Sequence, residues 1–268
     1  MAPEKLRQPG LTNIVDKNRG YCYTNFRMIN SIVKTFIDFI YPHACLLCRE
    51  KMPYGSTREL VCASCLDAVR RNSPPFCQKC GRKIKGTYTS KNICRDCRQA
   101  HYHFDRAWAS CSYEGAVKEM IHNFKYKNKI PLKKYLSQLM TEFIKEYRLP
   151  VNYCDYIAPV PLSAGKFRER EFNQSTLLAE NIARDFGINI LKDNLIRVRD
   201  TPSQTTLDMP GRRENVRGAF ALKKPEEVRE KIILLVDDVL TSGSTASEAA
   251  CALKGAGADV VFVLTLAN

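Results

Sequence analysis

The chain has 268 residues, is 44% hydrophobic and carries a formal net charge of +14, which suits one α/β domain with a smaller module beside it. No run of 18 apolar residues occurs and the first 20 residues lack the apolar centre of a secretory signal, so we expect no membrane span and a cytoplasmic protein. Residues 1–110 hold 19 basic and 8 acidic side chains, against 23 and 20 in residues 111–268, so the front of the chain either binds a polyanion or presents a solvated basic surface.

The first 41 residues divide into two predicted segments. Residues 1–25 are polar and without periodicity, which predicts a poorly ordered arm. Residues 26–41 repeat apolar side chains at steps of three and four, which predicts an amphipathic helix that ends at Pro42. This helix either packs on its own domain or binds a membrane surface or a partner.

Residues 42–105 contain four Cys-x-x-Cys pairs, with 13 residues between the first and second pairs and again between the third and fourth. The repeated spacing indicates an internal duplication. Each pair supplies two corners of a tetrahedron, so we expect a double zinc ribbon with two structural zinc ions and no catalytic metal position. Sequential pairing gives one site from Cys45, Cys48, Cys62 and Cys65 and another from Cys77, Cys80, Cys94 and Cys97, while interleaved pairing stays open.

Basic side chains decorate this cysteine-rich region, with Phe76 and Tyr88 among them. Cations and aromatic rings together are typical of surfaces that bind single-stranded nucleic acid. Zinc ribbons also serve as rigid spacers or protein docks, and the sequence leaves these alternatives open. The basic residues are Arg70, Arg71, Lys79, Arg82, Lys83, Lys85, Lys91, Arg95 and Arg98.

Residues 106–268 alternate strand and helix patterns, which predicts an α/β domain with a parallel sheet. Strands are expected at 108–113, 156–160, 195–198, 233–236 and 260–266. Helices are expected at 116–124, 132–147, 174–186 and 246–254. The polar segment 199–217 reads as a long functional loop.

The segment Ile233–Thr245 is the most informative one in this half. An apolar strand ends in Asp237 and Asp238, and Thr241, Ser242, Gly243, Ser244 and Thr245 then lead into a helix. Unpaired N–H groups at a helix N-terminus attract a phosphate, and small hydroxyl residues let it approach. Carboxylates repel phosphate, so they suit sugar hydroxyls, a divalent metal ion, or both.

These thirteen positions resemble the phosphoribosyl pyrophosphate (PRPP) loop of type I phosphoribosyltransferases. The resemblance implies that Asp237 and Asp238 bind the ribose 2′- and 3′-hydroxyls, and that Thr241–Thr245 wrap the 5′-phosphate of PRPP bound with magnesium. It also implies a pyrophosphate loop at Val160 and Pro161, followed by Lys166, Arg168 and Arg170. Arg199, Gln204, Arg212 and Arg213 of the long loop are then placed to close over the pyrophosphate and exclude water.

The combination of motifs resembles the ComF (ComFC-type) competence family from about residue 30 to the C-terminus. The motifs are the four cysteine pairs, YEGAVKEMIHNFKYKNK, APVPLSAGKFREREFNQS, TPSQTTLDMPGRRENVRGAF and ILLVDDVLTSGST. Membership implies a type I phosphoribosyltransferase-like domain behind a double zinc ribbon, and handling of single-stranded DNA during natural transformation. The chain departs from the family at Glu171, where we expect glycine, and this puts the role of Arg170 in doubt.

Three functions fit the sequence. The first is a phosphoribosyltransferase whose acceptor substrate the sequence does not reveal. The second is a non-catalytic nucleic-acid-binding protein that senses PRPP or a DNA 5′-phosphate. The third is a zinc-dependent scaffold that binds a DNA-uptake helicase or a similar partner.

Overall fold

The computed structural model describes residues 44–53, 59–84, 92–201 and 209–268. Two compact units divide the chain, residues 1–59 and 60–268. The predicted arm at 1–25 and the predicted helix at 26–41 lie outside the described residues. Among the described residues, no helix has the length and apolar character needed to cross a membrane.

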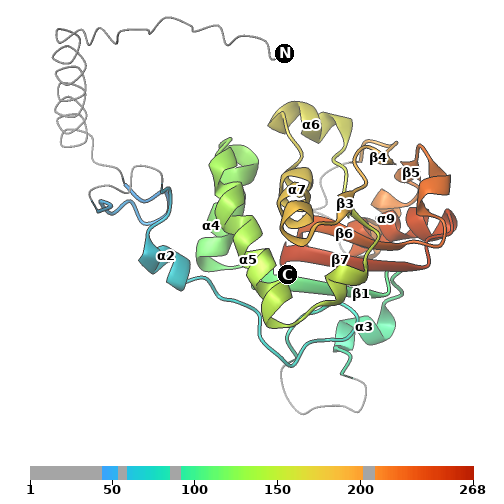
Figure 1. Cartoon of the computed structure of the whole chain (residues 1–268), viewed down its shortest axis with the longest axis horizontal. Coiled ribbons are helices and arrows are strands. Elements are labelled where there is room, and N and C mark those ends of the chain that lie inside the picture. The colour runs from blue at the N-terminus through green and yellow to red at the C-terminus, as the bar shows by residue number, and fades with distance from the viewer. Residues whose placement is uncertain (1–43, 54–58, 85–91, 202–208) are drawn as a thin grey trace, which may run out of the picture. The chain divides into compact units, whose positions relative to one another are not determined.

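The core of the second unit is a parallel sheet of five strands, in the order β1-β7-β6-β2-β3 (Figure 1). Every neighbouring pair in it is parallel. The central strands β6 and β7 are apolar along most of their length because helices cover both faces of the sheet. The strands are β1 (Arg106–Cys111), β2 (Tyr156–Pro159), β3 (Asn189–Ile190), β6 (Ile232–Val239) and β7 (Val260–Ala267).

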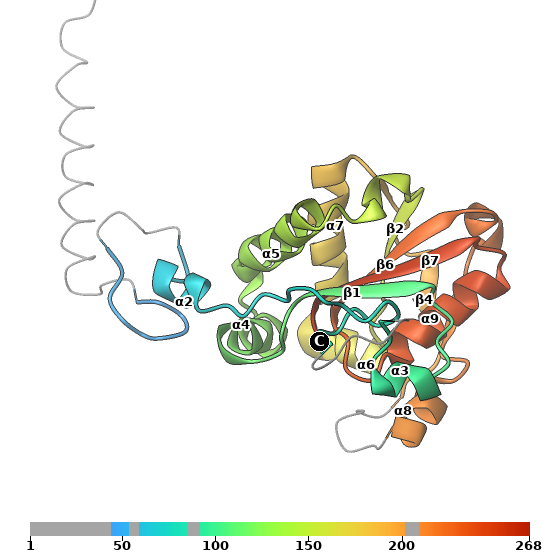
Figure 2. The same ribbon diagram turned by 90° about the horizontal axis from the view of Figure 1, so that it is seen from below.

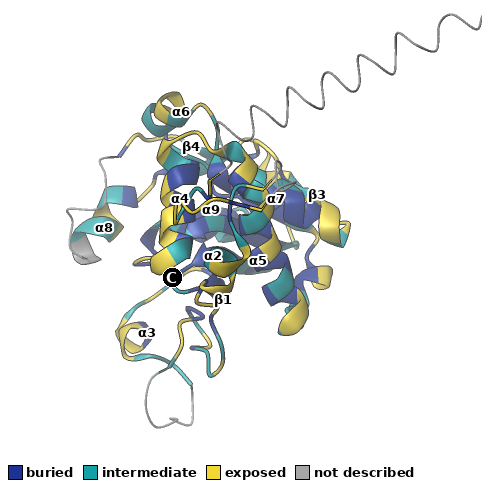
Figure 3. Cartoon of the chain, turned by 90° about the vertical axis from the view of Figure 1, so that its left-hand side faces the viewer, coloured by how far each residue is buried: buried dark blue, intermediate teal, exposed yellow. Residues whose placement is uncertain are grey.

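Helices α5 (Lys133–Glu146) and α7 (Gln174–Phe186) pack together on one face of the sheet, while α9 (Ser244–Gly255) packs on the other (Figure 2). Buried residues run along all three helices, and exposed ones are frequent only on α5, because α8 and β5 pack on α9 (Figure 3). Asn173 caps the start of α7 by accepting a hydrogen bond from the Ser175 N–H, and Gly187 ends it at φ 68°. The chain between β1 and β2 also forms α4 (Gly115–Tyr126) and the 3-10 turns η1 (Ile130–Leu132) and η2 (Pro150–Tyr153).

Three parts of the second unit differ from the prediction. The expected strand at 195–198 is β4 (Leu195–Arg197), which pairs antiparallel with β5 (Phe220–Leu222) outside the main sheet. The expected loop at 199–217 contains α8 (Met209–Val216), which packs on α9. The segment after the Pro-Val-Pro turn forms α6 (Ala164–Arg170), and η4 (Pro225–Val228) precedes β6. These short elements have little periodicity of their own and depend on tertiary packing.

The cysteine-rich region repeats one backbone pattern at an offset of 32 positions. Antiparallel bridges Ala44–Lys51 and Phe76–Lys83 flank the first pair of each half. The Cys45 and Cys77 N–H groups donate to the carbonyls of Glu50 and Arg82 at 2.9 and 2.8 Å. A short helix follows the first cysteine of each second pair: α2 (Ala63–Asp67) and α3 (Arg95–Gln99). The structure therefore carries the duplication that the spacing predicts.

The second half of this region belongs to the hydrophobic core of the sheet unit. Cys77, Cys80 and Cys97 are buried in one cluster with Phe104 and residues of β6, β7 and α9. The Ala107 N–H of β1 donates to the Lys79 carbonyl at 2.8 Å, and a Cβ on Gly81 would lie 2.5 Å from the Ala107 carbonyl oxygen. The second four-cysteine group is thus built into the domain that carries the sheet.

Candidate functional site

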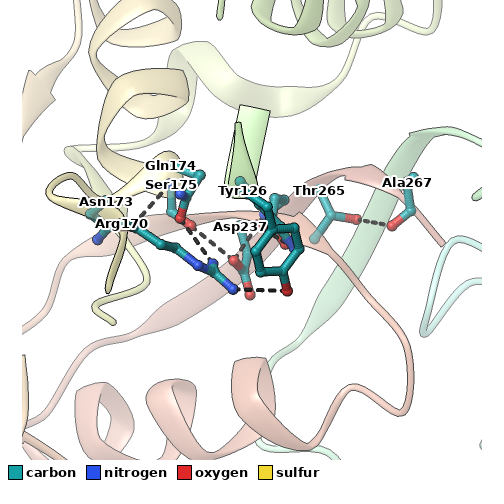
Figure 4. Close-up of polar contacts among 10 residues, drawn as sticks. Tyr126, Arg170, Asn173, Gln174, Ser175, Asp237, Thr265 and Ala267 are labelled. Atoms are coloured by element: carbon teal, nitrogen blue, oxygen red, sulfur yellow. Dashed lines mark hydrogen bonds and ion pairs between the residues drawn. The ribbon is translucent and has the colours of Figure 1, made fainter. Parts of the chain in front are cut away.

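Asp237 and Asp238 lie near the carboxyl end of β6, at the edge where ligands of parallel sheets bind. Asp237 Oδ1 accepts hydrogen bonds from Ser175 Oγ at 2.9 Å and from the Asp238 N–H at 2.8 Å (Figure 4). The first turn of α7 therefore fixes the orientation of Asp237.

Lys125, the penultimate residue of α4, reaches this acidic pair. Its Nζ lies 2.7 Å from Asp238 Oδ2, and the side chains of Lys125 and Asp238 are only 15% and 12% exposed. Burial lowers the Lys125 pKa, but the neighbouring Asp238 charge outweighs it and the net pKa is raised. Burial and the adjacent Asp238 charge raise the pKa of Asp237 to about 6. The pair is therefore held in a poorly solvated setting, with one lysine as its counter-ion.

The turn from Thr241 to Thr245 joins β6 to α9. Gly243 has φ 74°, a conformation that favours glycine, and α9 begins at Ser244. Ser242 Oγ and Ser244 Oγ lie 2.9 Å apart and hydrogen-bond within the turn, while Ser242, Gly243 and Ser244 are buried. Thr241 and Thr245 line a cavity on the side of the two aspartates. This arrangement presents the N-terminus of a 12-residue helix to a ligand.

The segment after β2 forms the opposite wall. Val160 and Pro161 follow the strand, and Asn173 Nδ2 donates to the Val160 carbonyl at 3.0 Å, which ties the wall to α7. Ser163 caps α6, and Asp200 Oδ2 accepts from the Gly165 N–H at 3.2 Å. Burial, together with the nearby cations Arg197 and Arg170, lowers the pKa of Lys166. The wall is therefore electropositive.

These walls enclose a cavity of about 500 Å³. Five basic side chains line it, Lys125, Lys166, Arg170, Arg197 and Arg212, against three acidic ones, Glu169, Asp237 and Asp238. Arg170 Nη2 donates to the Tyr126 hydroxyl at 3.2 Å, and its Nη1 donates to Gln174 Oε1 at 3.2 Å (Figure 4). The Nε atoms of Arg170 and Arg197 are buried with no hydrogen-bond partner in the part of the chain that the structure describes. Unsatisfied buried donors fit a site that receives an anion.

The sequence-predicted site residues therefore fall into two sets. The cavity lining contains Val160, Pro161, Lys166, Arg212, Asp237, Asp238, Thr241 and Thr245, with Ser242, Gly243 and Ser244 directly behind. Arg168 is exposed on α6 and Arg199 donates to the carbonyls of Asn215 and Arg217, so neither lines this cavity. Gln204 lies outside the described residues.

Sequence reasoning missed Lys125, Tyr126 and Arg197 as components of the site. Lys125 and Tyr126 end α4, directly after its buried Phe124 and about one turn beyond the buried Ile121. A lysine-rich stretch directly after an apolar helix face was the available signal. Arg197 lies in β4, whose position outside the main sheet no local pattern indicates.

Glu171 ends α6 in the left-handed conformation, at φ 64° and ψ −8°. A side chain costs about 1–2 kcal/mol there, which explains the expectation of glycine at this position. We predict that Glu171→Gly raises the free energy of unfolding by about 1 kcal/mol and Tm by about 2–4 °C.

Glu169→Gly in the same helix is the matched control, and thermal unfolding checks both variants. Here glycine replaces a good helix former and should cost about 1 kcal/mol. Equal destabilisation by the two substitutions would contradict the strain at Glu171.

The cysteines form two groups, Cys45–Cys48–Cys62–Cys65 and Cys77–Cys80–Cys94–Cys97, each with its sulfur atoms within 4.8 Å of one another. Pairing is therefore sequential in the described residues. Cys80 Sγ and Cys94 Sγ are 3.7 Å apart, close to the edge of about 3.8 Å of a tetrahedron with Zn–S bonds of about 2.3 Å. The Cys94 N–H donates to Cys77 Sγ at 3.3 Å, as suits a thiolate. Both groups fit structural zinc.

A second hollow, of about 1010 Å³, lies between the second cysteine group, the segment 70–72 and the residues just after β1 and β7, Ser112, Glu114 and Asn268. Six basic side chains line it against two acidic ones: Arg70, Arg71, Arg82, Lys83, Arg95 and Arg98 against Asp96 and Glu114. Exposed ion pairs neutralise part of this positive charge. In the pairs Arg70–Glu114 and Arg82–Asp96, a guanidinium nitrogen lies 2.7 Å from a carboxylate oxygen. Phe76 packs on Phe143 and Tyr147 of the sheet unit, with ring centroids 5.7 and 5.2 Å away, so it is engaged there. Lys85, Tyr88 and Lys91 lie outside the described residues.

Comparison with solved structures finds similarity to phosphoribosyl-transferring enzymes. A glutamine PRPP amidotransferase from B. subtilis aligns at TM-score 0.34 and 23% identity over 50% of this chain and 26% of its own. An adenine phosphoribosyltransferase from Leishmania tarentolae aligns at TM-score 0.31 and 16% identity over 53% of this chain and 74% of its own. The chain thus spans about a quarter of the amidotransferase.

Comparison by sequence covers most of the chain. The double zinc ribbon domain model matches residues 36–98. DNA utilization protein YhgH of Escherichia coli (strain K12) is 31% identical over 84% of this chain and 96% of its own length. Competence protein F of Haemophilus influenzae is 27% identical over the same shares, and competence protein ComFC of Streptococcus pneumoniae is 24% identical over 83% and 98%. Given these relatives, the two four-cysteine groups and the parallel α/β sheet, the chain belongs to the ComF family of competence and DNA-utilization proteins.

Proposed function

We propose that this protein binds PRPP with magnesium at the cavity beside the Thr241–Thr245 turn, binds single-stranded DNA, and acts in DNA uptake and use. The turn holds the 5′-phosphate through its main-chain N–H groups, and Asp237 and Asp238 accept hydrogen bonds from the ribose hydroxyls. Lys166, Arg170, Arg197 and Arg212 neutralise the pyrophosphate. Magnesium would enter with PRPP and share its charge. Names of relatives, competence protein and DNA utilization protein, support the role in DNA uptake.

The cavity also suits transfer of the ribosyl group. In that reaction the bond from ribose C1 to pyrophosphate breaks, a nitrogen of the acceptor attacks C1 and loses its proton, and pyrophosphate leaves with the bonding electrons. The five basic side chains would stabilise the charge that develops on pyrophosphate, and the walls would orient the sugar. Arg168 and Arg199 lie outside the lining of this cavity.

The observation that carries this proposal is the convergence of opposite charges in one cavity, with an acidic pair beside a helix N-terminus and five cations facing it. Calorimetry should detect PRPP binding that strengthens with magnesium. Ribose 5-phosphate and pyrophosphate, titrated separately, should each bind more weakly, because each fills one part of the cavity. No heat with any of the three ligands would reject the site.

The second hollow supports the proposal of single-stranded DNA binding. Its cations lie between α2 and Cys77, as Arg70 and Arg71, and within the second cysteine group, as Arg82, Lys83, Arg95 and Arg98. No aromatic side chain lines it within the residues that the structure describes, so we expect binding through phosphates rather than through stacked bases. Such binding tolerates any base sequence and depends steeply on salt.

Replacing Arg95 and Arg98 on α3 by alanine should weaken DNA binding uniformly across sequences. For single strands, each lost phosphate contact lowers the slope of log K against log salt by about 0.7, so the double variant should lose about 1.4. Fluorescence anisotropy with a labelled oligonucleotide over a salt series measures this slope. The matched control is Arg184→Ala with Lys192→Ala, on α7 and just beyond it, which should keep the wild-type slope.

A second candidate function is a non-catalytic sensor or scaffold that binds PRPP or a 5′-phosphate and recruits a DNA-uptake partner such as a helicase. The observation in its favour is the Lys125–Asp238 ion pair, which already neutralises the acid that would hold the sugar. A screen for pyrophosphate release with candidate bases separates the two. Binding of PRPP without release in the presence of any acceptor would favour the sensor.

A further inference from the structure

Residues beside the second cysteine group contact the phosphate-binding turn from behind. The Tyr102 hydroxyl donates to the Ser242 carbonyl at 3.0 Å, and Arg82 Nη2 lies 3.5 Å from the Thr241 carbonyl oxygen. The His103 N–H donates to Ser247 Oγ of α9 at 3.1 Å. Three contacts thus join the cysteine-rich segment to the turn and to the first part of α9.

Tyr102 also fixes the shape of the turn. A Cβ on Gly243 would lie 2.8 Å from Tyr102 Cε1, so the ring packs directly on the glycine backbone. The ring is itself held, since it stacks on the fully buried Phe104 with centroids 4.8 Å apart and planes inclined by 15°. Glycine at 243 is therefore required twice, by its φ of 74° and by the tyrosine ring.

These contacts set the direction of the main-chain donors. In a planar trans peptide, the carbonyl and the following N–H point in opposite directions. The Ser242 carbonyl is drawn toward Tyr102, so the Gly243 N–H points away from the cysteine-rich segment. The Thr241 carbonyl faces Arg82, which orients the Ser242 N–H in the same manner. A phosphate on the turn depends on donors that point this way.

The cysteine group in turn fixes Tyr102 and Arg82. Arg82 follows Cys80 by two positions and pairs with Asp96, between Cys94 and Cys97, at 2.7 Å. A small hollow of about 60 Å³ separates the turn from Cys80 and Cys97 and is lined by Arg82, Tyr102 and residues Leu240–Gly243. The sulfur ligands therefore lie one layer behind the turn.

We propose that Tyr102 is a positioning residue for the phosphate-binding turn, and that metal at the second cysteine group sets the affinity of this turn for a phosphate ester by fixing Tyr102 and Arg82. The inference rests on the proposed function, because it concerns the same turn. It adds a regulatory input, since loss of zinc or oxidation of these cysteines would weaken ligand binding without touching the cavity. Linkage requires the reverse effect as well: a bound phosphate ester tightens zinc at the second group.

The test compares ribose 5-phosphate with pyrophosphate on the full chain. Tyr102→Phe removes only the hydroxyl, so affinity for ribose 5-phosphate should fall about fivefold, as expected for one hydrogen bond. Affinity for pyrophosphate, which contacts side chains on the far walls, should stay unchanged. Tyr153→Phe, at a side chain that is 76% exposed, is the matched control. A general loss of structure would weaken both ligands alike and would overturn the positioning role.

The second part of the test measures how fast a chelator removes zinc. It starts from the zinc-bound protein, so the metal-free protein does not have to be folded. In a Cys45→Ser background only the second group holds zinc, and saturating ribose 5-phosphate should slow its removal by a chelator. Tyr102→Phe in that background should reduce the protection, and the Arg82 contact should retain part of it. If the wild-type protein binds ribose 5-phosphate, and Tyr102→Phe shows the same affinity and the same protection of zinc, this inference alone would be overturned. Wild-type protein that binds no phosphate ester would overturn the proposed function together with it.

Discussion

Asp237→Asn should reduce PRPP affinity by about 10- to 100-fold while leaving the fold intact. The asparagine Oδ1 still accepts from Ser175 Oγ and the Asp238 N–H, which now bond Asp237 at 2.9 and 2.8 Å. The substitution removes the negative charge of the carboxylate. A hydrogen bond from a ribose hydroxyl to this charged group contributes about 1.5–3 kcal/mol to binding. Because that charge is buried, the free energy of unfolding near pH 7.5 should be unchanged or higher. Calorimetry and thermal unfolding measure the two effects.

The pH dependence of PRPP affinity tests the role of Asp237 more specifically. The raised pKa of Asp237, about 6, means that the carboxylate is ionised above pH 6 and takes up a proton as the pH falls through that value. Wild-type affinity should therefore decline from pH 7 to pH 5 more steeply than that of Asp237→Asn, which retains only the titration of the ligand phosphates. The control is Asp193→Asn, an exposed position with φ 60° that asparagine tolerates. Identical pH profiles for wild type and Asp237→Asn would remove Asp237 from the site.

Cys77→Ser should release one of two zinc ions and lower Tm by about 10 °C or more. Three of the four cysteines in its group are buried in the core that includes Phe104, β6 and α9, so loss of the metal frees a segment that the sheet packs against. A loss of about 3–5 kcal/mol shifts Tm by this amount in a unit of this size. DNA binding should weaken as well, because α3 and its arginines lie within the same segment.

Cys45→Ser is the matched substitution, at the equivalent position 32 residues earlier. It should also release one zinc ion but shift Tm of the sheet unit by less than half as much, since Cys45 lies outside that core cluster. Zinc content by a colorimetric chelator and thermal unfolding check both. Equal shifts from the two substitutions would contradict the integration of the second group into the sheet domain.

Local chemistry made the central motifs predictable from sequence. A strand buried on both faces must be apolar, and the run Ile233–Val236 therefore indicated the middle of the sheet, where β6 lies. Cysteine spacing predicted two four-cysteine groups because each Cys-x-x-Cys pair forms a local turn that supplies two metal ligands by itself. Val160 and Pro161 line the cavity, and their assignment to a pyrophosphate loop remains a prediction from the family resemblance.

Contacts between distant segments were the part that sequence did not reveal. Lys125 reaches Asp238 across more than 100 positions, and nothing in its neighbourhood distinguishes it from Lys127 or Lys129. The packing of the second cysteine group on the sheet also depends on tertiary contacts. These are the contacts of Gly81 with β1 and of Tyr102 with Gly243, which the sequence does not reveal. At Glu171 the glycine was expected only from the family resemblance, and the left-handed backbone found there gives that expectation a physical reason.

The most direct test of the account is a crystal structure of the protein with PRPP and magnesium. We predict the 5′-phosphate on the main-chain N–H groups of Thr241–Thr245, the ribose hydroxyls on Asp237 and Asp238, and the pyrophosphate among Lys166, Arg170, Arg197 and Arg212. Density for PRPP elsewhere, or an empty turn with Lys125 still paired to Asp238 at saturating ligand, would contradict it.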